Sequence, residues 1–103
     1  MSVTVTVPMD GSTVVSVRGE IDHSTADTLR QEIVAAATRR RPSVLRLDLG
    51  LVTFLDSAAV GALVGAQREA VAEGVRVVIH RASPFVQRQL RIAGVHELLG
   101  TPF

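Results

Sequence analysis

An acidic residue and a serine are adjacent at a point where the sequence predicts the start of a helix. Asp56 and Ser57 follow the run Val52-Thr53-Phe54-Leu55 and precede Ala58-Ala59-Val60-Gly61. The amino end of a helix carries about half a positive charge and several unpaired N–H groups, so a phosphoryl group on Ser57 would be tolerated there. It would add about −2 charge beside Asp56 and turn a close contact with a partner into a repulsive one. On the pattern alone, simple capping of the helix by Asp56 or Ser57 is the more common role.

Two further segments carry candidate functional residues. Gly19-Glu20-Ile21-Asp22 precedes Ser24 and Thr25, and its simplest interpretation is a strand-to-helix turn whose acids favour the helix start. If Asp22 lies near Asp56, phosphorylation would gather two or three anions at one place. Gly61 and Gly65 form a G-x-x-x-G pair, which favours close packing of the helix in the core and leaves a partner-binding face as the alternative.

The residue pattern does not favour an enzyme. The three histidines, His23, His80 and His96, lie in different segments, and the chain has neither a G-x-S-x-G motif nor a glycine-rich phosphate loop. A Ser57–His80 dyad is the one nucleophilic arrangement left open. A response-regulator receiver domain would need an aspartate acceptor, an acidic magnesium pocket and a lysine, and this chain has no lysine. We therefore expect a non-enzymatic protein without cofactor or metal.

The elements that must position these residues follow from hydrophobic periodicity and from breakers. Strands are predicted at Val3–Val7, Val14–Val17 (ending at Gly19), Val44–Leu49 and Val75–Ile79. Helices are predicted from Ser24 or Thr25 to Pro42, from Asp56-Ser57 to Gly74, and from Ser83-Pro84 to Gly94, with a tail, Val95–Leu99, folded back on the core. The second helix is expected to bury Val60, Leu63, Val64, Ala70 and Val71.

This order predicts an α/β fold. The first two strands form a hairpin through Asp10-Gly11, and the helix-linked strands that follow make parallel pairs. We expect a single domain over residues 1–103, with a small mixed sheet covered mainly on one face by three to four helices.

Composition excludes several classes of protein. Apolar residues make up 47% of the chain, enough for a core, and the absence of cysteine excludes disulfides and thiolate metal sites. The net charge is +1, the basic run Arg39-Arg40-Arg41 fits a solvated helix end, and tyrosine and tryptophan are absent, so direct nucleic-acid binding is not expected. The apolar stretch 49–66 contains Asp56, which would cost about 3 kcal/mol at the centre of a bilayer. With no recognisable secretory leader, we expect a cytoplasmic protein that does not insert into membranes.

Three segments, in this order and spacing, resemble STAS domains, especially bacterial anti-sigma factor antagonists. Val17–Asp22 is similar to the family's G-E-[IL]-D stretch, and Ala26–Arg30 to the start of its first helix. Leu47-Asp48-Leu49 followed by Val52–Ser57 is similar to its phosphorylation-site segment. The resemblance covers nearly the whole chain.

The resemblance implies a phosphorylation switch at Ser57. An anti-sigma factor with serine kinase activity would bind the unphosphorylated protein and release its sigma factor, and a phosphatase would reverse the modification. ATP would belong to the kinase. The implied partner-binding residues are Asp22, Asp56, Ser57, Ala58, Ala59 and Gly61. Ala59 departs from the family, which usually has glycine there, and its methyl group would stiffen the helix start and hinder approach by the kinase backbone.

STAS domains also serve in other complexes, and these are the alternatives. One is a subunit of a lipid-transport complex that binds an ATPase without phosphorylation, and another is a stressosome-like scaffold. The tail of an anion transporter is disfavoured, because the chain contains no membrane segment. The sequence leaves the oligomeric state open.

Overall fold

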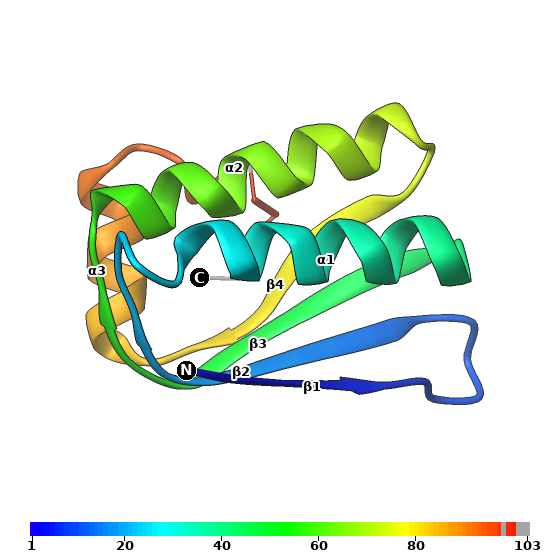
Figure 1. Cartoon of the computed structure of the whole chain (residues 1–103), viewed down its shortest axis with the longest axis horizontal. Coiled ribbons are helices and arrows are strands. Elements are labelled where there is room, and N and C mark those ends of the chain that lie inside the picture. Colours follow the sequence, from blue (N-terminus) through cyan, green and yellow to red (C-terminus); the bar gives the residue numbers. More distant parts are fainter. Residues whose placement is uncertain (98, 101–103) are drawn as a thin grey trace.

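Four strands form one mixed sheet in the order β1-β2-β3-β4 in the computed structural model, which describes residues 1–97, 99 and 100 (Figure 1). The elements along the chain are β1 (Ser2–Thr6), β2 (Thr13–Ile21), α1 (Ala26–Arg40), β3 (Val44–Leu55), α2 (Ser57–Ala72), β4 (Arg76–Ala82) and α3 (Pro84–Ile92). The β1–β2 pair is antiparallel, and β2–β3 and β3–β4 are parallel. The predicted hairpin and parallel pairs are confirmed, and β3 lies inside the sheet, between β2 and β4.

The helices α1 and α2 lie side by side on one face of the sheet, and α3 lies at the end where β3 leads into α2 (Figure 1). Side chains alternate along a strand, and Leu45, Leu47 and Leu49 of β3 all point into the layer between sheet and helices, where they are fully buried. Among the residues that the structure describes, no helix lies on the opposite face of the sheet (Figure 1). This confirms the α/β fold class with one covered face.

Two strands extend beyond their predicted ends. Gly19 was expected to end β2, but the strand continues to Ile21, and Gly19 adopts φ +95° between two irregularities of the β2–β3 register. A residue without Cβ takes this conformation at little cost, so the glycine bends the strand without ending it. β3 likewise continues past Leu49 to Leu55. Ile21 and Leu55 are partners in the register, and the two loops that follow them therefore begin side by side.

The buried face of α2 consists mainly of small side chains. Leu63 and Ala70 are buried as predicted, together with Ala59, Ala62 and Ala66, whereas Val60 and Val64 are only half-buried. Val71 is 52% exposed, which corrects the prediction for that residue. Alanine dominates because α2 must approach both the sheet and α1, and short side chains allow the closest contact between them.

The G-x-x-x-G pair does not pack as one unit. A Cβ on Gly65 would lie 3.6 Å from Cδ of Arg30 on α1, whereas a Cβ on Gly61 would meet nothing within 4 Å. Only Gly65 thus fits the interpretation as a packing residue. Gly61 is exposed.

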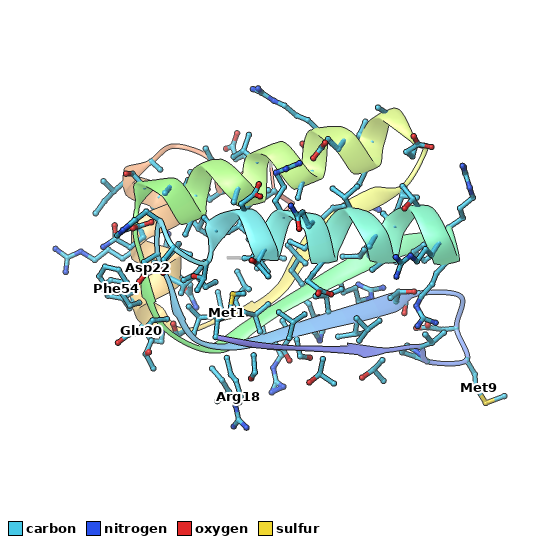
Figure 2. The ribbon with its side chains drawn as sticks, in the orientation of Figure 1. Met1, Met9, Arg18, Glu20, Asp22 and Phe54 are labelled. Atoms are coloured by element: carbon cyan, nitrogen blue, oxygen red, sulfur yellow. The ribbon has the colours of Figure 1, made fainter. Side chains whose placement is uncertain are left out.

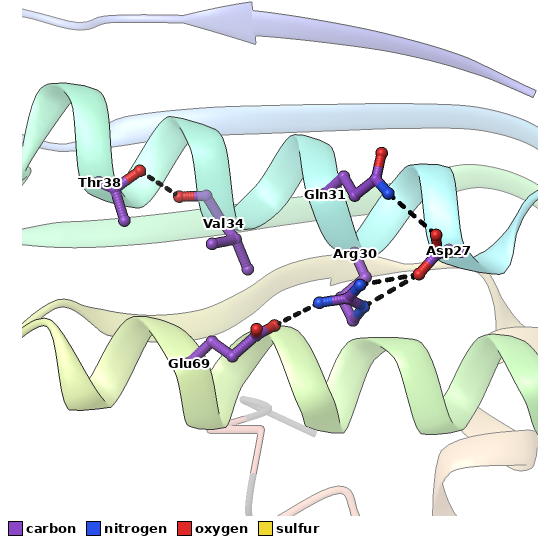
Figure 3. A network of polar contacts seen from close by, with 6 residues as sticks. All are labelled: Asp27, Arg30, Gln31, Val34, Thr38 and Glu69. Carbon is purple, nitrogen blue, oxygen red and sulfur yellow. Dashed lines mark hydrogen bonds and ion pairs between the residues drawn. The ribbon is translucent and has the colours of Figure 1, made fainter.

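A polar network joins the outer surfaces of the two helices (Figure 3). The Arg30 guanidinium donates to the Asp27 carboxylate (2.8 Å) and to the Glu69 carboxylate (2.8 Å). Because these groups are largely exposed, each pair contributes at most about 1 kcal/mol. The network links α1 to α2 but adds little to the stability of the fold.

The segment after α3 folds back on the core, as predicted. Leu99 is fully buried, and its carbonyl accepts a hydrogen bond from the Ile79 N–H of β4 (3.0 Å). Across the residues that the structure describes, no helix has the length and apolar character needed to cross a membrane.

Candidate functional site

Ser57 is the first residue of α2 and is exposed, directly after the end of β3. Asp56 is the N-cap residue, with an extended backbone, and its Oδ1 accepts a hydrogen bond from the Ala59 N–H (2.9 Å). In the described part of the chain, the Ser57 hydroxyl forms no hydrogen bond with another protein group. The acid therefore caps the helix, which leaves the hydroxyl available to solvent or to a partner.

The second oxygen of Asp56 reaches the loop between β2 and α1. Oδ2 accepts a hydrogen bond from the His23 N–H (3.0 Å), and the Asp56 N–H donates to the Ile21 carbonyl (3.3 Å). One carboxylate thus holds the beginning of α2 against the loop that contains Asp22.

Asp22 is fixed by the residues that follow it. Its Oδ1 accepts hydrogen bonds from the Ser24 hydroxyl (2.6 Å) and the Ser24 N–H (2.9 Å). These two bonds lower the pKa of Asp22 below its ordinary value, and the bond from the hydroxyl has the larger effect. Both bonds stabilise the charged form of the carboxylate. Asp22 therefore stays ionised at neutral pH. Thr25 is the N-cap residue of α1, but its side chain does not cap that helix and instead accepts from the Asp22 N–H (3.0 Å).

The structure separates the remaining predicted partner-binding residues into two groups. Ala58 and Gly61 are exposed, and they share the surface with Ser57. Ala59 is fully buried, and its N–H serves the Asp56 cap. Its methyl group points into the core, so the expectation that it would obstruct an approaching kinase backbone is corrected.

Replacing Ala59 by glycine is expected to destabilise the protein without improving phosphorylation. Loss of a buried methyl group and the lower helix propensity of glycine each cost about 1 kcal/mol. Urea unfolding would measure the lost stability, and the initial rate of phosphate uptake with a cognate kinase would measure access. A faster rate in Ala59→Gly would restore the obstruction hypothesis.

An aromatic pair beside this site was missed in the sequence. Phe54 of β3 and Phe85 of α3 stack with ring centroids 6.2 Å apart, and they are 42% and 39% exposed. Figure 2 shows Phe54 at the same end of the molecule as Asp22. The structure buries Val52 and Leu55 and exposes the two residues between them, so Phe54 is out of phase with the core, which the letters of the sequence alone did not show.

The histidines are dispersed. His23 lies in the loop after β2 and His80 on β4, both exposed, and His96 follows α3. No hydrogen bond joins Ser57 to His80 in the part of the chain that the structure describes, so the dyad left open by the sequence gains no support. Over the same residues, no three His, Asp or Glu side chains are grouped to hold a metal ion.

Comparison with known proteins identifies the family. Residues 5–100 match the family model described as Mlab, STAS domain. The anti-sigma F factor antagonist of Paenibacillus polymyxa is 28% identical over 89 residues, which cover 86% of this chain and 76% of that protein. The solved anti-sigma factor antagonist from Mycobacterium paratuberculosis is 30% identical, covers 99% of this chain and 87% of its own, and has a TM-score of 0.77.

The anti-sigma factor antagonist SpoIIAA in its unphosphorylated form shares the fold, with a TM-score of 0.76 at 23% identity over 93% of this chain and 84% of its own. Since the family model spans nearly all of the sequence and a solved relative matches almost the whole chain, the protein belongs to the STAS domain family.

Proposed function

We propose that this protein is an anti-sigma factor antagonist whose binding surface surrounds the beginning of α2 and is switched off by phosphorylation of Ser57. In its unmodified form it binds an anti-sigma factor with serine kinase activity, and the sigma factor is released. A phosphatase restores the active form. Such partners would place the protein in the cytoplasm.

One observation carries the proposal: an exposed hydroxyl at the start of α2 that does not cap the helix and that follows Asp56, whose carboxylate also binds the loop containing Asp22. The unpaired N–H groups of the helix start can donate hydrogen bonds to a phosphoryl group, so the modification would not unfold the domain. Asp22 and Asp56 contribute two negative charges, and a phosphoryl group on Ser57 adds about two more. A surface suited to close contact would then repel an acidic or tightly fitting partner. The relatives' names support the same function, and the fold neighbour SpoIIAA is known in unphosphorylated and phosphorylated forms.

The proposed binding surface contains both polar and apolar groups. Ala58 and Gly61 present little bulk, so that a partner's backbone can approach closely. Phe54 and Phe85 form a half-exposed aromatic patch next to the switch, and aromatic side chains often supply the central anchors of interfaces. Truncation of these two side chains would weaken binding of the partner without changing the charge of the surface.

Intact-mass measurement after incubation with a candidate anti-sigma kinase and ATP tests the switch. Wild type should gain the mass of one phosphoryl group, and Ser57→Ala should gain none. Thr53→Ala is the matched control, because Thr53 is the neighbouring exposed hydroxyl on β3, and this variant should be modified like wild type. Phosphate uptake that persists in Ser57→Ala would move the acceptor to another residue and contradict the proposal.

A second candidate function is favoured by the description of the matching family model, which names Mlab rather than an antagonist. The same surface would then bind an ATPase subunit of a lipid-transport complex, or a stressosome-like assembly, without phosphorylation. Affinity capture with wild type, analysed by mass spectrometry, separates the two. Recovery of an ATP-binding anti-sigma kinase supports the first function, and recovery of a transporter ATPase supports the second.

A further inference from the structure

The helix-free face of the sheet carries a row of polar side chains across all four strands. In the register, Thr4 pairs with Ser16, Ser16 with Asp48, and Asp48 with Arg81. Paired residues point to the same side of a sheet, and successive residues point to opposite sides. Since Val15 and Val17 are buried beneath the helices, Ser16 and the rest of its row face away from them.

An adjacent row contributes a second arginine. Ser2 pairs with Arg18, and Arg18 pairs with Leu51. Figure 2 shows the Arg18 side chain extending from the sheet on the side opposite the helices. Two guanidinium groups, one from β2 and one from β4, thus stand on either side of β3.

Between these long side chains the surface is hollowed. The hollow has a volume of about 450 Å³ and is lined by Ser2, Thr4, Ser16, Val17, Arg18, Asp48, Gly50, Leu51 and Arg81. Its volume is in the range typical of small-molecule sites, about 300–1,000 Å³. Several of the lining residues are small, and a Cβ at Gly50 would lie 3.2 Å from Oδ1 of Asp48, a tight contact that the carboxylate would have to relieve.

The charge in the hollow is positive. Asp48 already accepts a hydrogen bond from the Gly50 N–H (3.0 Å), and its other oxygen is 3.9 Å from the Arg81 guanidinium. Arg18 has no carboxylate partner within residues 1–97, 99 and 100. Two cations therefore face one carboxylate that already accepts a hydrogen bond from the backbone, and the hydroxyl groups of Ser2, Thr4 and Ser16 line the β1 and β2 side of the hollow.

We propose that this hollow binds a small anionic metabolite that carries a phosphate or a carboxylate group. The planar guanidinium groups of Arg18 and Arg81 match the geometry of either oxyanion. The hydroxyls of Ser2, Thr4 and Ser16 would contact the polar remainder of the ligand, and Leu51 would cover its apolar part. The site lies outside the surface around Ser57 and does not rest on the function proposed above.

Titration of the ¹⁵N-labelled full chain, followed by amide chemical shifts, tests this inference. The probes are glycerol 3-phosphate, glycerate and, as the neutral control, glycerol, each at millimolar concentration. At least one anion should give saturable shifts centred on Ser16, Arg18 and Gly50, whereas glycerol should give none. Stronger binding of glycerol 3-phosphate assigns the site to phosphate, and stronger binding of glycerate assigns it to carboxylate.

Variants test whether the residues that line the hollow bind the anion. Arg18→Gln and Arg81→Gln should each weaken binding at least tenfold, and Arg68→Gln, which changes an exposed arginine on α2, should leave it unchanged. The dispersion of the same spectra reports whether each variant is folded. The inference is overturned if neither anion shifts these amides, if glycerol does so equally, or if Arg68→Gln loses as much affinity as the other two.

Discussion

Replacement of Ser57 by aspartate is expected to weaken binding to the anti-sigma partner at least tenfold, equivalent to about 1.4 kcal/mol. Ser57 is exposed at the first position of α2, next to the capping Asp56, whose carboxylate also binds the loop that contains Asp22. A third carboxylate would concentrate negative charge at a place where the partner must approach closely. The carboxylate would then lose its bound water when the complex forms. The effect of a phosphoryl group should be larger, because it carries about twice the charge. Isothermal titration calorimetry against the purified partner measures the change.

Ser57→Asn is the matched control for this prediction. Asparagine has nearly the size and shape of aspartate but no charge, so this variant should keep most of the affinity of wild type. Equal affinities for wild type and Ser57→Asp would show that charge at this position does not control binding. An equal loss in the Asn and Asp variants would assign the effect to size instead.

Truncation of Leu47 to alanine should lower the free energy of unfolding by about 3 kcal/mol, the usual cost of a cavity at a fully buried leucine. Leu47 is completely buried on β3, which pairs with β2 on one side and β4 on the other. Its neighbours belong to the strands and helices that form the core, so the cavity cannot collapse easily. Urea unfolding monitored by circular dichroism measures the loss.

Leu51→Ala provides the comparison on the same strand. Leu51 is 62% exposed on the helix-free side of β3, and the same chemical change there should cost less than about 0.5 kcal/mol. Similar losses in the two variants would mean that the sheet buries its two faces alike, contrary to the architecture described here.

Periodicity was sufficient to predict the order and the type of the elements. Pro42 and Gly74 follow the ends of α1 and α2, and Ser83 with Pro84 begins α3, as local capping and breaking rules require. The limits of β2 and β3 were missed, because glycine at 19 and 50 looks like a strand end in sequence. Whether such a residue ends a strand or bends it depends on the neighbouring strand, which local sequence does not contain.

The candidate site was predicted in part. Sequence placed Asp56 and Ser57 at a helix start, but the proximity of the two loops depends on the pairing of Ile21 with Leu55, a contact distant in sequence. The burial of Ala59 depends on how α2 is rotated about its axis. The valines at positions 60, 64 and 71 predicted a different buried face of the helix. The stacking of Phe54 on Phe85 requires the position of α3 relative to β3, set partly by the hydrogen bond from the Ser83 hydroxyl to the Val52 carbonyl (2.9 Å).

The division of the Asp56 carboxylate between two amides makes His23 a spectroscopic reporter. One oxygen is bound to the helix and the other to an amide 33 positions earlier in the chain. Any event that draws the carboxylate toward α2 must lengthen its bond to His23 and change the magnetic environment of that amide. An isotope label on His23 alone would therefore reveal occupancy of the helix start.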